Sequence, residues 1–322
     1  MDVAIAGGGL IGLASALELA RRGLRVTVVD AGEPGQASWA AAGILGPQSE
    51  AHEPSPLVEL CVRSYELYPE FVQSLDADVG LRRNGTLHVA FSDAEAHELR
   101  ARQAWQSQRG LRIEERSHPG AALALFFPDE GQVDNRKLHQ ALGAACAKAG
   151  VAFEQRKLRS LDELKATRKV LCAGSWARAL AEVPVFPQKG QLVLLDAAPP
   201  AQVIFGGGGY AVPRGGRTIV GATGEDAGFD TLPTTEGRAV LLGIAARLGY
   251  ADPPIVDHWA GLRPATADGL PYFDKLPDKT VVAAGHFRNG VLLTPISARI
   301  VAALVCEETP PVDLLPFSLA RR

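Results

Sequence analysis

Three glycines and an aspartate near the start of the chain have the spacing of a dinucleotide-binding turn. Gly7, Gly9 and Gly12 form a Gly-x-Gly-x-x-Gly pattern, and Asp30 stands 18 positions after Gly12. In such a turn the first glycine permits a sharp bend, the second lets the backbone approach a pyrophosphate, and the third allows close packing of helix on strand. A carboxylate at the position of Asp30 can accept hydrogen bonds from both ribose hydroxyls. The pattern predicts nucleotide binding and leaves FAD and NAD both open.

The residues around this motif predict the elements that would hold it. The apolar run 3–6 predicts a strand, residues 10–22 repeat apolar side chains at helical spacing, and residues 25–29 read as a second parallel strand. A helix that begins at the glycines would direct its free N–H groups and positive dipole end at the phosphates. A glycine-rich turn without a ligand is the alternative, but strand, helix, second strand and acid all agree with a nucleotide site.

Arg263 is a second candidate for chemistry. It lies between the apolar run 259–262 and Pro264, where a guanidinium is awkward to bury unless an anion meets it. Its planar fork matches a carboxylate. A salt bridge to Asp257 or Asp268 is the competing structural interpretation.

Length and charge restrict the class of protein. The chain has 322 residues, of which 47% are hydrophobic and 21% charged, enough for one large core or two interleaved domains. The net charge of −3 gives no basic surplus for nucleic acid. The longest uncharged apolar run, residues 3–17, is interrupted by glycines and belongs to the predicted turn, so neither a signal peptide nor a membrane span is expected. We therefore expect a cytoplasmic protein that binds no membrane.

Cysteine and histidine spacing gives no metal site. Cys61, Cys146, Cys172 and Cys306 are widely separated and lie in apolar patterns, which favours buried reduced thiols. The seven histidines show no ligand spacing, and most are expected at the surface or in loops. No Ser-His-Asp or paired-carboxylate arrangement is evident.

Later segments predict an α/β fold whose nucleotide domain is discontinuous. Helices are expected at residues 56–74, 93–109, 134–150 and 296–305, with strands at 85–91, 151–153 and 169–173. Short antiparallel strands are expected at 191–195, 203–205, 210–213 and 218–221. We predict a Rossmann-like nucleotide-binding domain from residues 1–80, 135–185 and 255–322. Residues 81–134 and 186–254 would form a substrate domain with a largely antiparallel sheet.

Four motifs in order carry a family resemblance. They are residues 37–45 (ASWAAAGIL), 210–214 (YAVPR), 259–264 (WAGLRP) and 285–290 (GHFRNG). With the N-terminal fingerprint, they resemble the D-amino-acid-oxidase family of flavoproteins, whose FAD domain is like that of glutathione reductase. Within it they are most similar to the glycine oxidase branch of thiamine biosynthesis. The resemblance spans nearly the whole chain and implies FAD, held without a covalent bond.

The resemblance also implies which residues contact FAD. Small side chains in the run 37–45 would let the backbone lie against a flat ring system, and residues 285–292 precede a helix whose positive end would stabilise reduced flavin. Leu158 matches the adenine-side contact. The implied FAD-binding residues are Gly7, Gly9, Leu10, Ile11, Gly12, Asp30, Ala31, Ala37, Ser38, Ala42, Gly43, Ile44, Leu158, Ala173, Gly174, His286, Phe287, Arg288, Asn289, Gly290, Val291 and Leu292.

Substrate binding is assigned by the same resemblance. Arg263 would clamp a carboxylate, Tyr210 would add a hydroxyl hydrogen bond, and Arg288 would close the pocket near the flavin. Hydride transfer from the substrate α-carbon to flavin N5 would give an imino acid, then a 2-oxo acid and ammonia, with hydrogen peroxide formed from oxygen. Gly224 and the run 206–209 replace larger side chains of the family, which puts strict glycine specificity in question.

Several alternatives stay open at this point. Another D-amino acid, a secondary amine such as sarcosine or a 2-hydroxy acid could be the substrate, and an acceptor other than oxygen could take the electrons. Two alternatives come from other classes of protein: the chain could be an NAD-dependent dehydrogenase, or a subunit that holds a structural flavin. A purely structural flavin would need neither Arg263 nor Arg288. Family members often associate, so a homo-oligomer is one expectation.

Overall fold

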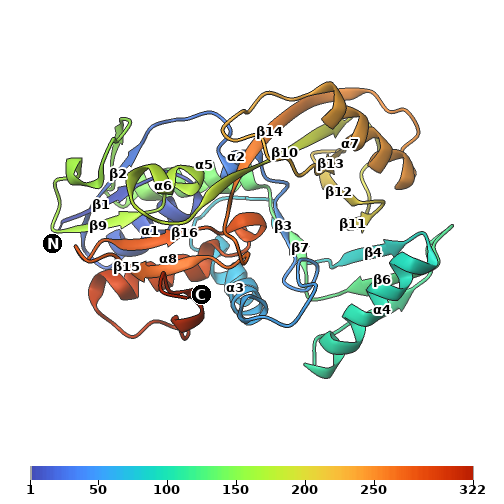
Figure 1. The fold of residues 1–322 in the computed structure, drawn as a ribbon, viewed down its shortest axis with the longest axis horizontal. Coiled ribbons are helices and arrows are strands. Elements are labelled where there is room, and N and C mark those ends of the chain that lie inside the picture. Colours follow the sequence, from blue (N-terminus) through green and yellow to red (C-terminus); the bar gives the residue numbers. More distant parts are fainter. Residues whose placement is uncertain (1, 322) are drawn as a thin grey trace.

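The fold is described from a computed structural model that covers residues 2–321. A six-stranded sheet lies at one end of the molecule (Figure 1). Its order is β15 (Tyr272–Lys275), β16 (Val281–Ala284), β9 (Arg168–Leu171), β1 (Asp2–Ala6), β2 (Arg25–Asp30) and β8 (Ala152–Gln155). The pairings are parallel except that of β15 with β16. The predicted Rossmann-like arrangement is therefore confirmed.

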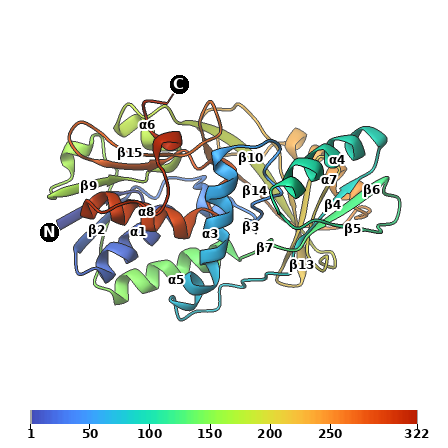
Figure 2. The same ribbon diagram turned by 90° about the horizontal axis from the view of Figure 1, so that it is seen from below.

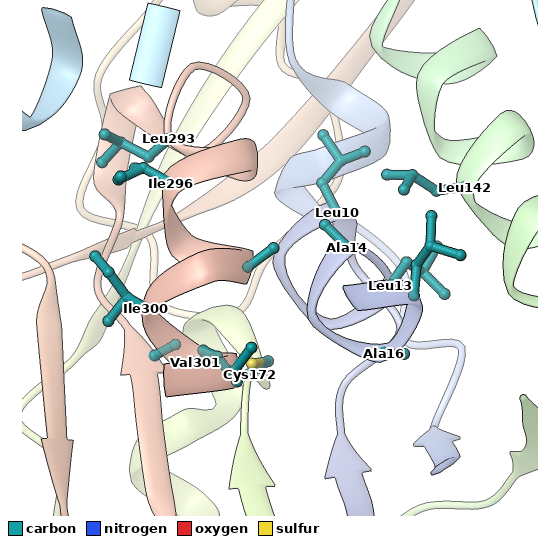
Figure 3. Close-up of a cluster of buried hydrophobic side chains, with 14 of the residues drawn as sticks. Leu10, Leu13, Ala14, Ala16, Leu142, Cys172, Leu293, Ile296, Ile300 and Val301 are labelled. Atoms are coloured by element: carbon teal, nitrogen blue, oxygen red, sulfur yellow. The ribbon is translucent and has the colours of Figure 1, made fainter. Parts of the chain in front are cut away.

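Helices cover this sheet and form the main core. They are α1 (Leu10–Arg21), α3 (Pro56–Gln73), α5 (Asn135–Lys148) and α8 (Thr294–Cys306). Helix α1 is central because it packs against both α5 and α8. Figure 3 shows Leu13 on α1 pointing toward Leu142 on α5, with Ile300 and Val301 on α8. The predicted helix at residues 10–22 is confirmed, and its close packing fixes the direction of its N-terminus.

An eight-stranded, mainly antiparallel sheet occupies the other end (Figures 1 and 2). Helix α7 (Thr235–Arg247) packs on one part of it and α4 (Asp93–Gln108) on another. Strands β11 and β4 pair in parallel and join two distant parts of the chain. The order is β14 (Ile255–Ala265), β10 (Phe186–Leu195), β13 (Arg217–Gly221), β12 (Gly209–Arg214), β11 (Val203–Gly206), β4 (Thr86–Ala90), β6 (Leu123–Phe127) and β5 (Glu114–Arg116).

Two features connect the ends of the molecule. Strands β10 and β14 run antiparallel from Phe186 opposite Ala265 to Leu195 opposite Ile255. The short strands β3 (Ile44–Leu45) and β7 (Gly131–Gln132) form a second crossing. Strand β14 belongs to the larger sheet, although it lies within the segment 255–322 that we assigned to the nucleotide domain. The division into domains stays a prediction.

Some elements were not expected from the sequence. Helix α7 was not predicted, because it buries only part of one side, at Gly237, Leu241, Ile244 and Ala245. His88 and His286 are buried, whereas the other five histidines are exposed or half-buried, as expected for most of them. The four cysteines are free, and three of them are buried. No group in the described residues could hold a metal ion, and no helix there is long and apolar enough to cross a membrane.

Candidate active site

The glycine turn between β1 and α1 is built by close backbone contacts. Gly7 has φ +110°, and a Cβ there would overlap the carbonyl oxygen of Cys172 at the end of β9. A Cβ on Gly12 would overlap the carbonyl oxygen of Gly7. The first glycine therefore serves the bend, and the third lets α1 pack onto the turn, as the motif predicts.

The side chains of Asp30 and Ser38 accept hydrogen bonds from backbone N–H groups of the turn. The Gly8 N–H donates to Oδ2 of Asp30 at 2.6 Å, and the Gly32 N–H donates to Oδ1 at 2.7 Å. The Leu10 N–H, the first of helix α1, donates to the Ser38 hydroxyl at 3.0 Å. Asp30 is thus fixed beside the N-terminus of α1, where its remaining acceptor capacity faces the cavity described next.

One long cavity connects this turn to the larger sheet. It begins at Asp30, Arg156 and Leu158, passes the glycine turn, and ends at Tyr210 and Arg263. The substrate candidates Tyr210, Arg263 and Arg288 all line it. So do the cofactor candidates Gly7, Gly9, Ile11, Asp30, Ala31, Ala37, Ser38, Ala42, Gly43, Ile44, Leu158, Ala173, Gly174, His286, Phe287, Arg288, Asn289, Gly290 and Val291. Leu10, Gly12 and Leu292 do not; they are buried in the packing behind it.

The cavity suits FAD in three respects. It is elongated, its middle is formed by backbone and small side chains of residues 37–44, and the N-terminus of α1 opens onto it at Gly9 and Ile11. Helix α1 has 12 residues and no side-chain cap on Gly9. Apart from the Leu10 N–H, which donates to Ser38, its first-turn N–H groups and its dipole can therefore meet a pyrophosphate. These residues fit the adenosine and pyrophosphate of FAD at one end and a ring system toward Arg288.

Two further glycines make room for the side chains at the substrate end. A Cβ on Gly190 of β10 would overlap the Arg263 guanidinium, and a Cβ on Gly221 would overlap the Tyr210 ring. Burial lowers the pKa of Arg263 and raises the pKa of Tyr210, and Tyr210 opposes the shift at Arg263. Both groups are still protonated near neutral pH, so the guanidinium and the hydroxyl are both available as donors.

Arg263 is oriented by a backbone carbonyl. Its Nη1 donates to the Thr223 oxygen at 3.0 Å, and no carboxylate within residues 2–321 forms a salt bridge with it. Asp268, one of the two alternative partners, pairs instead with Arg321. The predicted competing salt bridges are therefore absent from the described structure, and the guanidinium is left for a ligand anion.

A buried polar network fixes the segment that carries Thr223. The Gln191 N–H donates to the Thr223 hydroxyl at 2.9 Å, and Gln191 Nε2 donates to Glu225 at 2.7 Å. The ammonium of Lys189, which is fully buried, donates to Asp230 at 2.7 Å. All these contacts join β10 to residues 223–230. The carbonyl that orients Arg263 is therefore held by side chains that the sequence analysis did not single out.

The segment before α8 forms the wall near Arg288. Phe287 adopts φ +47°, which is strained for a non-glycine residue. His286 is buried and its Nε2 lies 3.0 Å from the Ser297 hydroxyl. Arg288 lines the cavity, and its Nε lies 3.6 Å from Oε2 of Glu50. Sequence reasoning missed Glu50, although a carboxylate five residues after Leu45, just past the small-residue run, is a signal that could have drawn attention to it.

The glycine run 206–209 forms a hairpin turn. A Cβ on Gly206 would lie 2.8 Å from the Val89 oxygen, and one on Gly207 would lie 2.9 Å from Cβ of Arg247. Added Cβ atoms at Gly208 and Gly224 would meet nothing within 4 Å. None of these glycines lines the cavity. Most of the run therefore serves close packing, and Gly224, next to Thr223, is the departure nearest to Arg263.

A glycine turn at a helix N-terminus, a cavity that begins there and, at its far end, an arginine without a carboxylate partner among the described residues are the arrangement expected of a nucleotide-dependent oxidoreductase. The family model "FAD dependent oxidoreductase" (DAO) matches residues 2–304. The chain belongs to this family, which uses FAD, as the resemblance implied. NAD is thereby set aside as the cofactor.

Individual relatives agree with this assignment. The chain is 37% identical to the glycine oxidase of Geobacillus kaustophilus, over 99% of this chain and 97% of the relative. It is 38% identical to the bifunctional protein ThiO/ThiG of Synechocystis sp., over 99% of this chain and 54% of that protein, and so spans about half of its length. The crystal structure of the Geobacillus kaustophilus glycine oxidase matches with a TM-score of 0.93 and 34% identity, covering 100% of this chain and 98% of that chain.

Proposed function

We propose that this protein is an FAD-dependent oxidase of glycine or another small amino acid or amine. One observation carries the proposal: the Arg263 guanidinium and the Tyr210 hydroxyl share the end of the cavity that begins at the dinucleotide-binding turn. The similarity to glycine oxidases along the full chain supports it. A place in thiamine biosynthesis, a cytoplasmic location and oxygen as acceptor belong to the same proposal.

The residues at the substrate end would each have a defined task. Arg263 would bind the substrate carboxylate as a fork, Tyr210 would donate a hydrogen bond to it, and Thr223 would hold the guanidinium in orientation. Bound FAD would supply the two-electron acceptor. Loss of a hydride from the α-carbon and of a proton from the nitrogen leaves an imine, and water converts the imine to a 2-oxo acid and ammonia. Oxygen takes the two electrons and two protons to give hydrogen peroxide.

A related candidate is oxidation of a bulkier D-amino acid or of sarcosine. Gly224 gives this candidate no support, because it is exposed and does not line the cavity, so the open space beside it faces solvent. A 2-hydroxy acid is a further alternative within the family. These candidates differ from glycine in size or in the group next to the carboxylate, so one experiment separates them.

The test is the visible spectrum of the purified protein during anaerobic titration with glycine, sarcosine, D-alanine, D-proline and glycolate in turn. Bleaching of a bound flavin by glycine or D-alanine would support the proposal, and bleaching only by sarcosine would support the related candidate. Bleaching only by D-proline or only by glycolate would reassign the substrate. A flavin bleached by none of them would contradict the proposal, and peroxide measured on readmission of air identifies oxygen as the acceptor.

A further inference from the structure

Glu50 is the carboxylate at the substrate end of the cavity, where its negative charge acts to raise the pKa of both Tyr210 and Arg263. Among the described residues, Asp30 and Glu33 are the other acids that line the cavity, and both lie at its opposite end. The Glu50 side chain is 18% exposed and faces Arg288 at 3.6 Å, too far for a hydrogen bond. Within residues 2–321 its carboxylate accepts no hydrogen bond from protein. Its oxygens are therefore free to accept donors from a ligand.

The backbone that carries Glu50 is held by buried side chains. The Gln48 and Ser49 N–H groups donate to Oε1 of Glu130 at 2.6 and 2.7 Å, and Glu130 is completely buried. Nε2 of Gln106 donates to the carbonyl oxygens of Gln48 and Ala51 at 3.0 and 3.1 Å. The chain is thus fixed on both sides of Glu50 by residues from β6–β7 and α4.

A directed series of hydrogen bonds completes this support. Arg102 donates to Nδ1 of His88 at 2.6 Å, and since arginine can only donate, the ring proton must lie on Nε2. Nε2 then donates to the Ser49 hydroxyl at 2.7 Å, which donates in turn to Glu130. Arg102 also donates to the Ser49 carbonyl at 3.0 Å. The hydrogen bonds of His88 and Ser49 therefore belong to the support of the segment that carries Glu50.

We infer that Glu50 is a specificity-determining residue. Its carboxylate accepts hydrogen bonds from the amino group of the substrate and so selects amino acids over 2-hydroxy acids. The inference rests on the proposed function. A substrate whose carboxylate lies on Arg263 and Tyr210 places its α-substituent at the same end of the cavity as Glu50. An amino group offers at least two N–H donors and takes a positive charge, whereas a hydroxyl offers one donor and stays neutral. Glu130, Arg102 and Gln106 are the positioning residues, because their hydrogen bonds hold the backbone on both sides of Glu50.

The experiment compares Glu50→Gln with Glu53→Gln, an exposed acid on the same segment. We expect Glu50→Gln to raise KM for glycine by about 10- to 100-fold, the loss of a hydrogen bond to a charged group. The Kd of glycolate, measured from perturbation of the flavin spectrum, should stay the same or fall. Glu53→Gln should match the wild type in both. Bound flavin and thermal unfolding verify that each variant is folded.

A second variant tests the positioning. Gln106→Leu removes the donor to the carbonyls on either side of Glu50 and should raise KM for glycine. In the Glu50→Gln background the same substitution should leave KM unchanged, because Gln106 acts on the substrate only through the Glu50 carboxylate. Equal weakening of glycine and glycolate by Glu50→Gln, or no change in either, would overturn the inference. If glycine still bleaches the wild-type flavin in that case, the proposed function stands without it.

Discussion

The Arg263 guanidinium occupies the space that a side chain on Gly190 would need. Strand β10 places Gly190 directly opposite Gly261 of β14, two residues before Arg263, and the guanidinium folds back over the neighbouring strand. A glycine in the middle of a strand weakens the strand and signals a close approach. The approach here is that of the side chain proposed to bind the substrate carboxylate.

We predict that Gly190→Ala displaces this guanidinium. The added methyl group overlaps it, so KM for the substrate should rise at least about 10-fold, the loss of one charge-assisted hydrogen bond, while FAD stays bound. Steady-state kinetics and the flavin spectrum measure both. Gly143→Ala on α5, where a Cβ meets nothing within 4 Å, is the matched control and should leave KM unchanged. An unaltered KM in Gly190→Ala would show that the guanidinium position is unimportant.

Arg263→Ala should remove the carboxylate clamp itself. Because Arg263 has no carboxylate partner in the described structure, its loss disrupts no salt bridge there, and catalytic efficiency should fall by about 100-fold or more. Arg263→Lys should recover only part of the loss, since an ammonium lacks the planar fork. Loss of FAD with intact substrate binding would show instead that this arginine serves the cofactor.

Asp30→Ala should weaken FAD binding. The change removes the acceptor of the Gly8 N–H as well as the acid expected to meet the ribose, so the dissociation constant of FAD should rise at least about 10-fold. Fluorescence of released flavin measures it. Glu154→Gln, on the neighbouring strand β8 and exposed, is the control. If both variants bind FAD equally well, the role assigned to Asp30 is wrong.

Stability should decrease as the pH falls below about 6.5. Burial lowers the pKa of His286 to about 3, so the unfolded chain takes up a proton that the folded protein does not. The stabilisation is present above the unfolded pKa and is lost as pH falls toward the folded one, by about 1.4 kcal/mol per pH unit. Burial also lowers the pKa of His88 well below its ordinary value.

Urea unfolding at saturating FAD between pH 6.5 and 5 measures this slope. His286→Gln should reduce it by about one proton, that is, about 1.4 kcal/mol per pH unit. His97→Gln, at an exposed position on α4, should not change it. A slope that stays the same in His286→Gln would mean that this histidine is not held neutral in the folded protein.

Local patterns in the sequence predicted the nucleotide-binding turn well. Gly7, Gly12 and Asp30 act within 24 residues, and their roles follow from backbone geometry that the sequence spacing expresses directly. The antiparallel strands were also anticipated, because turns of glycine and proline separate them. The residues that support the substrate end were not predicted. Lys189, Glu130 and Arg102 have their hydrogen-bond partners far along the chain, so their roles are visible only in the folded structure.

The glycine run 206–209 is a second case in which the local sequence was not sufficient for a prediction. Its sequence suggested an enlarged pocket, but the structure uses most of it for packing in a hairpin turn. An absent side chain can signify room for a ligand or room for a neighbour, and only the tertiary contacts distinguish the two.

The range of residues that line the cavity, from Ala6 to Val291, has a consequence for biosynthesis. The first strand and the glycine turn leave the ribosome early, but the wall formed by His286 and Arg288 is made almost last. The parallel pairing of β4 with β11 likewise joins segments more than 100 residues apart. A nascent chain therefore cannot hold FAD in the complete cavity until synthesis is nearly finished. Since a ligand that binds only the folded state stabilises it, FAD bound in the complete cavity can stabilise only a chain whose synthesis has reached residue 291.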